Sequence, residues 1–186
     1  MGLFSWLIGG KHKSKISADA TALGLSQAVL FWCSPPEIAK TRASLHIPRD
    51  ARNFDEELFY LYVFLTVISV EVSYRDNESF RLDLAKSFMH YINEAMAAGD
   101  ALCFRATPNN MQQRYAQYLT LRERGPEELI KRLPYTFLVS NGVCRSDSPH
   151  DMDTLGMPLI YMEAWIGGML NDLLSVNQQW RKKHRI

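Results

Sequence analysis

The longest apolar run in the chain extends from Leu58 to Val70 and ends at Glu71. A segment of this length falls well short of the ~20 residues that a helix needs to cross a bilayer, so it indicates a buried core element. Its valines and isoleucine favour a strand, yet the run is far longer than a typical strand of about 5 to 6 residues. Because length discriminates better than propensity here, we predict a buried central helix over Asn53 to Tyr74, with a strand around Val63-Val72 as the alternative.

Two further segments show a clear helical period. Apolar residues recur at three- and four-residue steps between Asn77, a candidate N-cap, and Gly99, a candidate stop. The same spacing begins after Pro158, which we expect to start the last helix. The predicted buried stripes consist of Phe80, Leu84, Phe88, Ile92 and Ala95 in the first helix, and of Leu159, Met162, Ile166, Met169, Leu170, Leu173 and Trp180 in the second.

Capping signals define two helices near the start of the chain. One helix is expected from Ile16 to Cys33, with Ser17 or Asp19 as its N-cap. A second is expected after Ser34, which has the spacing of a capping box with Glu37. The two helices are expected to form a hairpin.

Asparagine, proline and glycine residues mark the predicted helix ends and loops in the rest of the chain. A helix is expected to begin near Asn109 or Asn110, and Pro126 opens another helical stretch that Pro134 limits. The stretch from Ser140 to Gly156 is rich in Ser, Asp, Gly and Pro, which predicts a long surface loop. Together these elements predict an all-α fold, a single irregular helical bundle of about six to seven helices.

Composition and charge indicate how the chain is organised. Its 186 residues are 47% hydrophobic, enough to bury a core without disulfides or metal. Seven of the 21 Lys and Arg residues lie in residues 1–15 and 181–186, where there is no Asp or Glu, so the remainder has 14 basic residues against 20 acidic ones. We therefore expect a flexible amphipathic and basic N-terminal segment over residues 1–15 and an acidic helical domain over residues 16–186.

The N-terminal segment places bulky apolar residues before a glycine pair and a small basic cluster. Such a segment can insert its aromatic residues at a lipid interface while its lysines meet anionic headgroups. The alternative is a tail without contacts, or one that docks on the domain or on a partner. The residues predicted to make the membrane or partner contact are Phe4, Trp6, Leu7, Lys11, Lys13 and Lys15.

Two adjacent glycines lie inside the last predicted helix, where each costs about 1 kcal/mol relative to alanine. Gly167 and Gly168, together with Ala164, form a small surface that another helix can approach closely. The pattern favours helix packing within the chain, then contact with a second subunit, and last a groove that faces a ligand.

No motif points to catalysis, metal binding or a cofactor. Neither GxxxxGK[ST] nor GxGxxG occurs, and Ser26 lies between two helical flanks where a nucleophile elbow needs a strand before the serine. His90 and Glu94 share a helix face that we expect to be exposed to solvent. The three cysteines form no CxxC pair, which suits a reducing compartment. We predict no catalytic residue, metal ligand or cofactor, and a cytoplasmic location that extends to the inner membrane surface.

These features predict a non-enzymatic helical interaction domain, one that binds a protein partner or forms a homo-oligomer and contacts an anionic membrane surface through its N-terminus. The alternative is a helical binding module that holds a small apolar ligand or cofactor among methionines and aromatic residues. An enzyme of unrecognised type is the third hypothesis. Nucleic-acid binding is not expected, because the body of the chain is acidic and only Trp180 adjoins the basic C-terminus.

Overall fold

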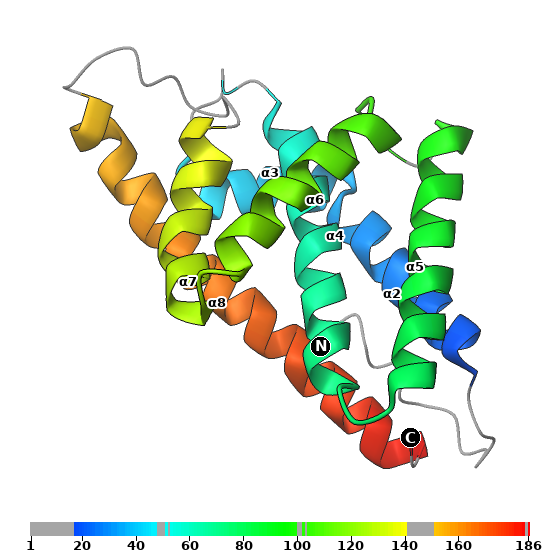
Figure 1. The fold of residues 1–186 in the computed structure, drawn as a ribbon. Coiled ribbons are helices and arrows are strands. Elements are labelled where there is room, and N and C mark those ends of the chain that lie inside the picture. The colour runs from blue at the N-terminus through cyan, green and yellow to red at the C-terminus, as the bar shows by residue number, and fades with distance from the viewer. Residues whose placement is uncertain are drawn as a thin grey trace.

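The computed structural model describes residues 17–47, 51, 53–99, 102, 104–140, 151–184 and 186. These residues form seven α-helices and one π-helical turn, and none of them lies in a strand (Figure 1). The predicted all-α helical bundle is confirmed. The alternative strand around Val63-Val72 is wrong, because these residues lie inside helix α4 (Phe54–Ser73).

Helix α4 stands at the centre of the molecule, where Figure 1 shows it upright among the other helices. It packs against α2 (Ala18–Trp32), α5 (Glu78–Ala98), α6 (Pro108–Arg122) and α8 (Asp151–His184). Every residue from Leu58 to Val70 is buried as a result. A helix that is apolar on all sides is stable only when other elements surround it, which explains why this segment shows no amphipathic period.

The first two helices start with different caps. The Ser17 hydroxyl accepts a hydrogen bond from the Ala20 N–H at 3.1 Å, which confirms Ser17 as the N-cap of α2. The capping box at Ser34 is not formed, because the Ser34 side chain makes no capping hydrogen bond at the start of α3 (Pro35–Ser44). The first two residues of α3 are prolines, so two of the N–H donors that a cap would satisfy do not exist.

Helix α5 begins and ends as its sequence predicts. The Asn77 side chain accepts a hydrogen bond from the Phe80 N–H at 3.3 Å, and Gly99 ends the helix with a φ of 72°, a left-handed conformation that favours glycine. Helix α6 begins slightly earlier than the asparagines suggest. Thr107 is its N-cap and Pro108 its first residue.

Pro134 does not end the helical stretch that Pro126 begins. Helix α7 (Pro126–Tyr135) follows Gly125, whose φ of 111° requires glycine, and it passes through Pro134 into a π-helical turn over Thr136–Ser140. Pro134 has no N–H for the regular bond to the carbonyl four residues earlier. The change from α-helical to π-helical hydrogen bonding just after the proline accommodates this missing bond.

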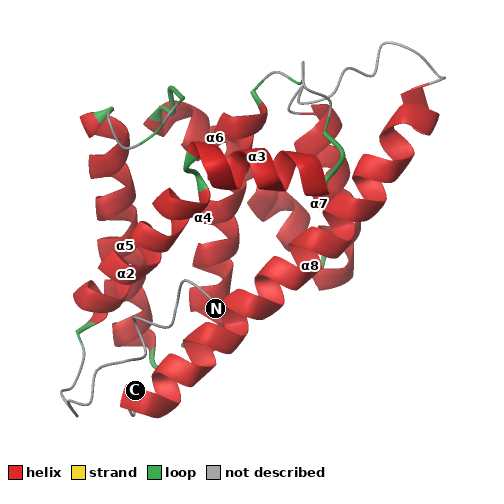
Figure 2. Cartoon of the chain, turned by 180° about the vertical axis from the view of Figure 1, so that it is seen from behind, coloured by secondary structure: helices red, strands yellow, loops and turns green. Residues whose placement is uncertain are grey.

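Helix α8 crosses the whole molecule and lies in front in the view of Figure 2. It begins at Asp151, so Pro158 lies inside the helix rather than at its start, and the last residues of the predicted loop are helical. A single proline removes only one hydrogen bond of a helix this long. The predicted stripe faces inward: Met162, Ile166, Leu173 and Trp180 are buried, and Leu159, Met169 and Leu170 pack against the core.

One contiguous hydrophobic core includes residues from all seven described helices. Aromatic contacts join α2, α4 and α8 within this core. The centroid of the Tyr62 ring lies 5.2 Å from that of Trp32 and 5.4 Å from that of Trp165. None of the helices in the described part of the chain combines the length and apolarity needed to span a membrane.

Candidate functional site: a cleft between α4, α5 and α6

The predicted contact residues of the N-terminal segment all precede Ser17 and lie outside the described residues: Phe4, Trp6, Leu7, Lys11, Lys13 and Lys15. Their role stays a prediction. The other predicted contact residues, Ala164, Gly167 and Gly168, lie on α8.

The two glycines of α8 do not meet another helix within the described structure. A Cβ atom added at Gly167 or Gly168 would have nothing within 4 Å, and both Ala164 and Gly168 are exposed. Close packing by the described part of the chain therefore does not account for the two glycines, and packing by other parts of the chain stays a prediction. Contact with a second subunit stays a prediction for this face.

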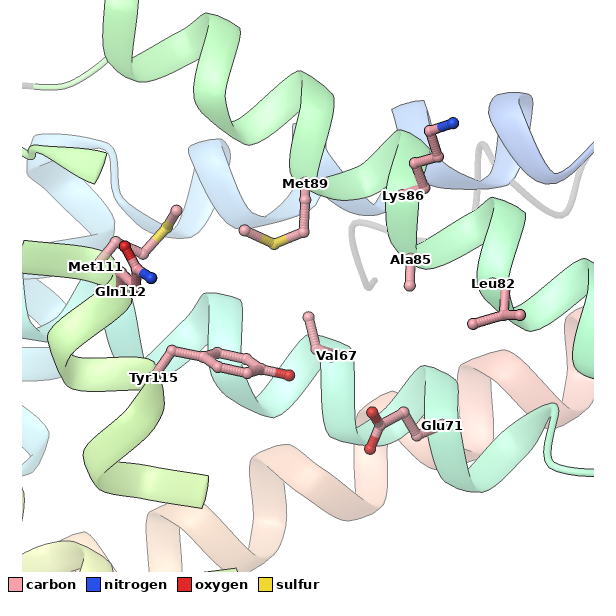
Figure 3. A pocket seen from close by; sticks show the side chains of 9 residues that line it. All are labelled: Val67, Glu71, Leu82, Ala85, Lys86, Met89, Met111, Gln112 and Tyr115. Carbon is pink, nitrogen blue, oxygen red and sulfur yellow. The ribbon is translucent and has the colours of Figure 1, made fainter. Parts of the chain in front are cut away.

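The described structure contains a cleft of about 470 Å³ where α5 and α6 both pack on α4 but separate from each other (Figure 3). This volume falls within the usual range of ligand pockets, roughly 300 to 1,000 Å³. The residues that line the cleft are Val67 and Glu71 from α4, Leu82, Ala85, Lys86 and Met89 from α5, and Met111, Gln112 and Tyr115 from α6.

The cleft is apolar in its interior and polar at its rim. Figure 3 shows Met89 and Met111 reaching toward each other across the gap, with the Tyr115 ring and Val67 below them. The Lys86 ammonium points away from the cleft. Unbranched methionine side chains adapt to ligands of different shape, so this lining suits an apolar group better than a polar one.

The α5 wall of the cleft arises from a second apolar stripe on that helix. Leu82, Ala85 and Met89 recur at three- and four-residue steps, beside the Phe80 stripe that faces the core. Leu82 remains 57% exposed, whereas Ala85 and Met89 are half-buried. Sequence reasoning missed these residues, although the spacing of the second stripe was a visible signal.

At one end the cleft opens into a basic hollow of about 410 Å³. Glu71, Leu82 and Ala85 line both spaces, so the two lie side by side. The hollow adds three arginines to this shared wall: Arg75 after α4, Arg81 in α5 and Arg122 at the end of α6. The lining of this hollow thus contains three arginines and one carboxylate.

The ionisable groups of the cleft are partly engaged with one another. Arg122 donates a hydrogen bond to the Glu71 carboxylate, which links the ends of α4 and α6. Burial, and then the nearby Glu71 charge, raise the pKa of the Tyr115 hydroxyl, while Arg122 lowers it less. Tyr115 therefore stays protonated at neutral pH and can donate a hydrogen bond inside the cleft.

The other candidates from the sequence have structural roles. His90 and Glu94 lie 3.4 Å apart on an exposed face of α5, and the described residues contain no cluster of His, Cys, Asp or Glu that could hold a metal ion. Ser26 is buried in α2 and donates a hydrogen bond to the Leu23 carbonyl at 2.8 Å. Arg181, from the basic C-terminus, pairs with Asp76 at 2.7 Å.

No family model matches the chain, and no curated protein or solved structure shows significant similarity to it.

Proposed function

We propose that this protein is a helical binding module that holds a small apolar group in the cleft between α4, α5 and α6. The observation that supports the proposal is the lining of the cleft, in which Met89, Met111 and Tyr115 surround an open space of about 470 Å³. A space of this size exposes apolar side chains to water unless a ligand covers them.

The structure around the cleft is well suited to hold such a space open. Its floor belongs to α4, the most buried helix, and Val67 there is only 6% exposed. The walls are fixed independently of each other, because α5 packs against α2 and α6 against α7. A ligand can therefore enter without displacing the core, which keeps the cost of reorganisation low.

A neutral apolar fluorophore tests this proposal directly. N-phenyl-1-naphthylamine should bind the protein with a rise in fluorescence, and Ala85→Phe should weaken its binding at least ~10-fold, because the added ring fills the cleft. Ala97→Phe is the matched control, since Ala97 is exposed on the same helix and does not line the cleft. Equal affinity of the two variants, or no binding by the unmodified protein, would refute the proposal.

Self-association through α8 is a second candidate function. The supporting observation is the exposed face of this helix, where Ile160 is 64% exposed and Gly168 has open space above it. Two copies could approach closely at the glycines in a symmetric contact, because a two-fold interface uses the same patch on both partners.

Contact between the N-terminal segment and an anionic membrane surface in the cytoplasm also stays a proposal. It is motivated by the apolar residues and lysines that precede residue 16. The full chain should sediment with anionic vesicles, and removal of residues 1–15 should leave it in the supernatant. Unchanged sedimentation after this deletion would exclude the segment as the membrane contact.

A further inference from the structure

The basic hollow beside the apolar cleft gives one end of the binding site a strong charge preference. Arg75, Arg81 and Arg122 line it together with Glu71, the one carboxylate in that lining. The arginine charges would repel a cationic group placed there and would not attract an uncharged one. An anionic group would be attracted, more strongly than in bulk water because the surrounding protein lowers the effective dielectric constant.

The three arginines differ in how strongly they already pair with carboxylates of the protein. Arg122 bonds to Glu71, so its charge is largely neutralised. Arg81 is only loosely paired, because 3.7 Å separates its nearest nitrogen from Glu78, a residue whose side chain is 75% exposed. The Arg75 side chain makes no hydrogen bond or ion pair with any described residue; the pKa of the neighbouring Asp76 is lowered mainly by its hydrogen bond from Arg181 and to a smaller extent by the Arg75 charge. Arg75 and Arg81 are therefore the two cations available to a ligand.

The two hollows lie side by side, so an elongated ligand is the kind of molecule that could reach from one to the other. Leu82 and Ala85 line the apolar cleft and the basic hollow alike, and Val72, which is 49% exposed, extends the apolar surface into the basic end. The site therefore has an apolar interior that leads to a cationic mouth. This arrangement is complementary to a molecule with an apolar tail and a negative head.

We propose that the ligand is a single-chain amphiphile with an anionic head group, whose tail lies in the cleft and whose head pairs with Arg75 and Arg81. This inference rests on the proposed function, since it names the ligand of the same cleft. A carboxylate and a phosphate share the required chemistry, because guanidinium groups bind both through paired N–H donors.

Probes that share one tail and differ in head-group charge test this inference. Decanoate, decyl phosphate and decyltrimethylammonium are each titrated against the protein loaded with N-phenyl-1-naphthylamine, below their critical micelle concentrations. Both anions should displace the fluorophore at concentrations at least ~10-fold lower than the cation, since the arginine charges attract an anionic head group and repel a cationic one. The anion that displaces the fluorophore at the lower concentration shows whether the hollow prefers a carboxylate or a phosphate.

Arginine variants show whether the preference arises in this hollow. In Arg75→Gln/Arg81→Gln the advantage of the anions should fall at least ~10-fold while the neutral fluorophore binds as before, because its binding uses only the apolar cleft. The double variant Arg105→Gln/Arg124→Gln removes the same charge from exposed positions outside both spaces and should retain the preference.

The outcomes separate this inference from the proposed function. If the fluorophore binds but anions and cation displace it equally, or if the arginine variant keeps the full preference, the anionic head group is wrong and the apolar site stands. If the fluorophore fails to bind the unmodified protein, the proposed function fails as well.

Discussion

At the scale of single residues, an ion pair between α4 and α6 is a costly interaction to disrupt. The Glu57 carboxylate is only 3% exposed, and the Arg114 Nε donates to both of its oxygens, at 2.7 and 2.9 Å. Tyr60 reinforces the same junction, because its hydroxyl accepts a hydrogen bond from the Thr107 N–H at 3.2 Å. These contacts fix the start of α6 on α4 and so hold one wall of the cleft in place.

Removal of the Arg114 cation should destabilise the fold more than the loss of an ion pair on the surface does. We expect Arg114→Met to lower the free energy of unfolding by roughly 2 to 3 kcal/mol, because it leaves the Glu57 charge buried without this partner. The cost should be below that of a fully buried pair, since Arg114 is 28% exposed. Urea denaturation monitored by circular dichroism measures the change.

Two further variants serve as controls for this pair. Glu57→Gln/Arg114→Met should recover at least about 1 kcal/mol relative to the single variant, because a neutral amide is cheaper to bury than a carboxylate. Lys40→Met breaks the exposed pair with Glu37 and should cost less than about 1 kcal/mol. The expectation is wrong if Arg114→Met and Lys40→Met prove equally mild.

At the scale of helices, the sequence predicts those helix ends that depend on interactions between residues close together in the chain. The caps at Ser17, Asn77 and Gly99 use short-range hydrogen bonds or a special φ, so residue types alone indicate them. The predicted helix end at Pro134 and the predicted helix start at Pro158 are wrong for a related reason. Proline locally favours a helix boundary, but tertiary packing of the flanking segments outweighs one missing hydrogen bond.

The cleft could not be predicted in the same way, because it exists only where three helices meet. Leu82 and Met89 form a recognisable second stripe, but the sequence does not show whether another helix covers it. Met111 and Tyr115 come from a different helix, and nothing in the local pattern indicates that they face Met89. The relative placement of α5 and α6 depends on packing against α4, which is a non-local property.

The contrast between the first two helix caps gives a prediction at this scale. Ser17→Ala should lower the free energy of unfolding by about 1 kcal/mol and the melting temperature by roughly 2 to 4 °C, because the N–H of Ala20 loses its acceptor. Ser34→Ala is the matched control and should change stability by less than about 0.5 kcal/mol, since its side chain caps nothing. Thermal unfolding of both variants decides the question, and a larger loss at Ser34 would contradict it.

At the scale of the whole molecule, α8 is the element that joins the parts of the fold and also presents a free face. Its inner side holds α2 and α4 together through hydrogen bonds from Trp180 Nε1 to the Thr21 hydroxyl at 3.1 Å and from the Asn177 amide to the Ser69 hydroxyl at 3.0 Å. Its outer side carries Ala164 and Gly168, both exposed. A substitution on the outer side can therefore test assembly without disturbing the core.

Self-association predicts that Gly168→Leu shifts the protein from dimer to monomer in size-exclusion chromatography with light scattering, because the leucine side chain would hold the two helices apart. Removing a helical glycine should at the same time raise the stability of the single chain by up to about 1 kcal/mol, since nothing within 4 Å opposes a larger side chain at its base. Ala97→Leu on α5 adds similar bulk away from this face and should leave the dimer intact. A Gly168→Leu protein that is more stable and still dimeric would place the subunit contact elsewhere, whereas a monomeric unmodified chain would exclude self-association altogether.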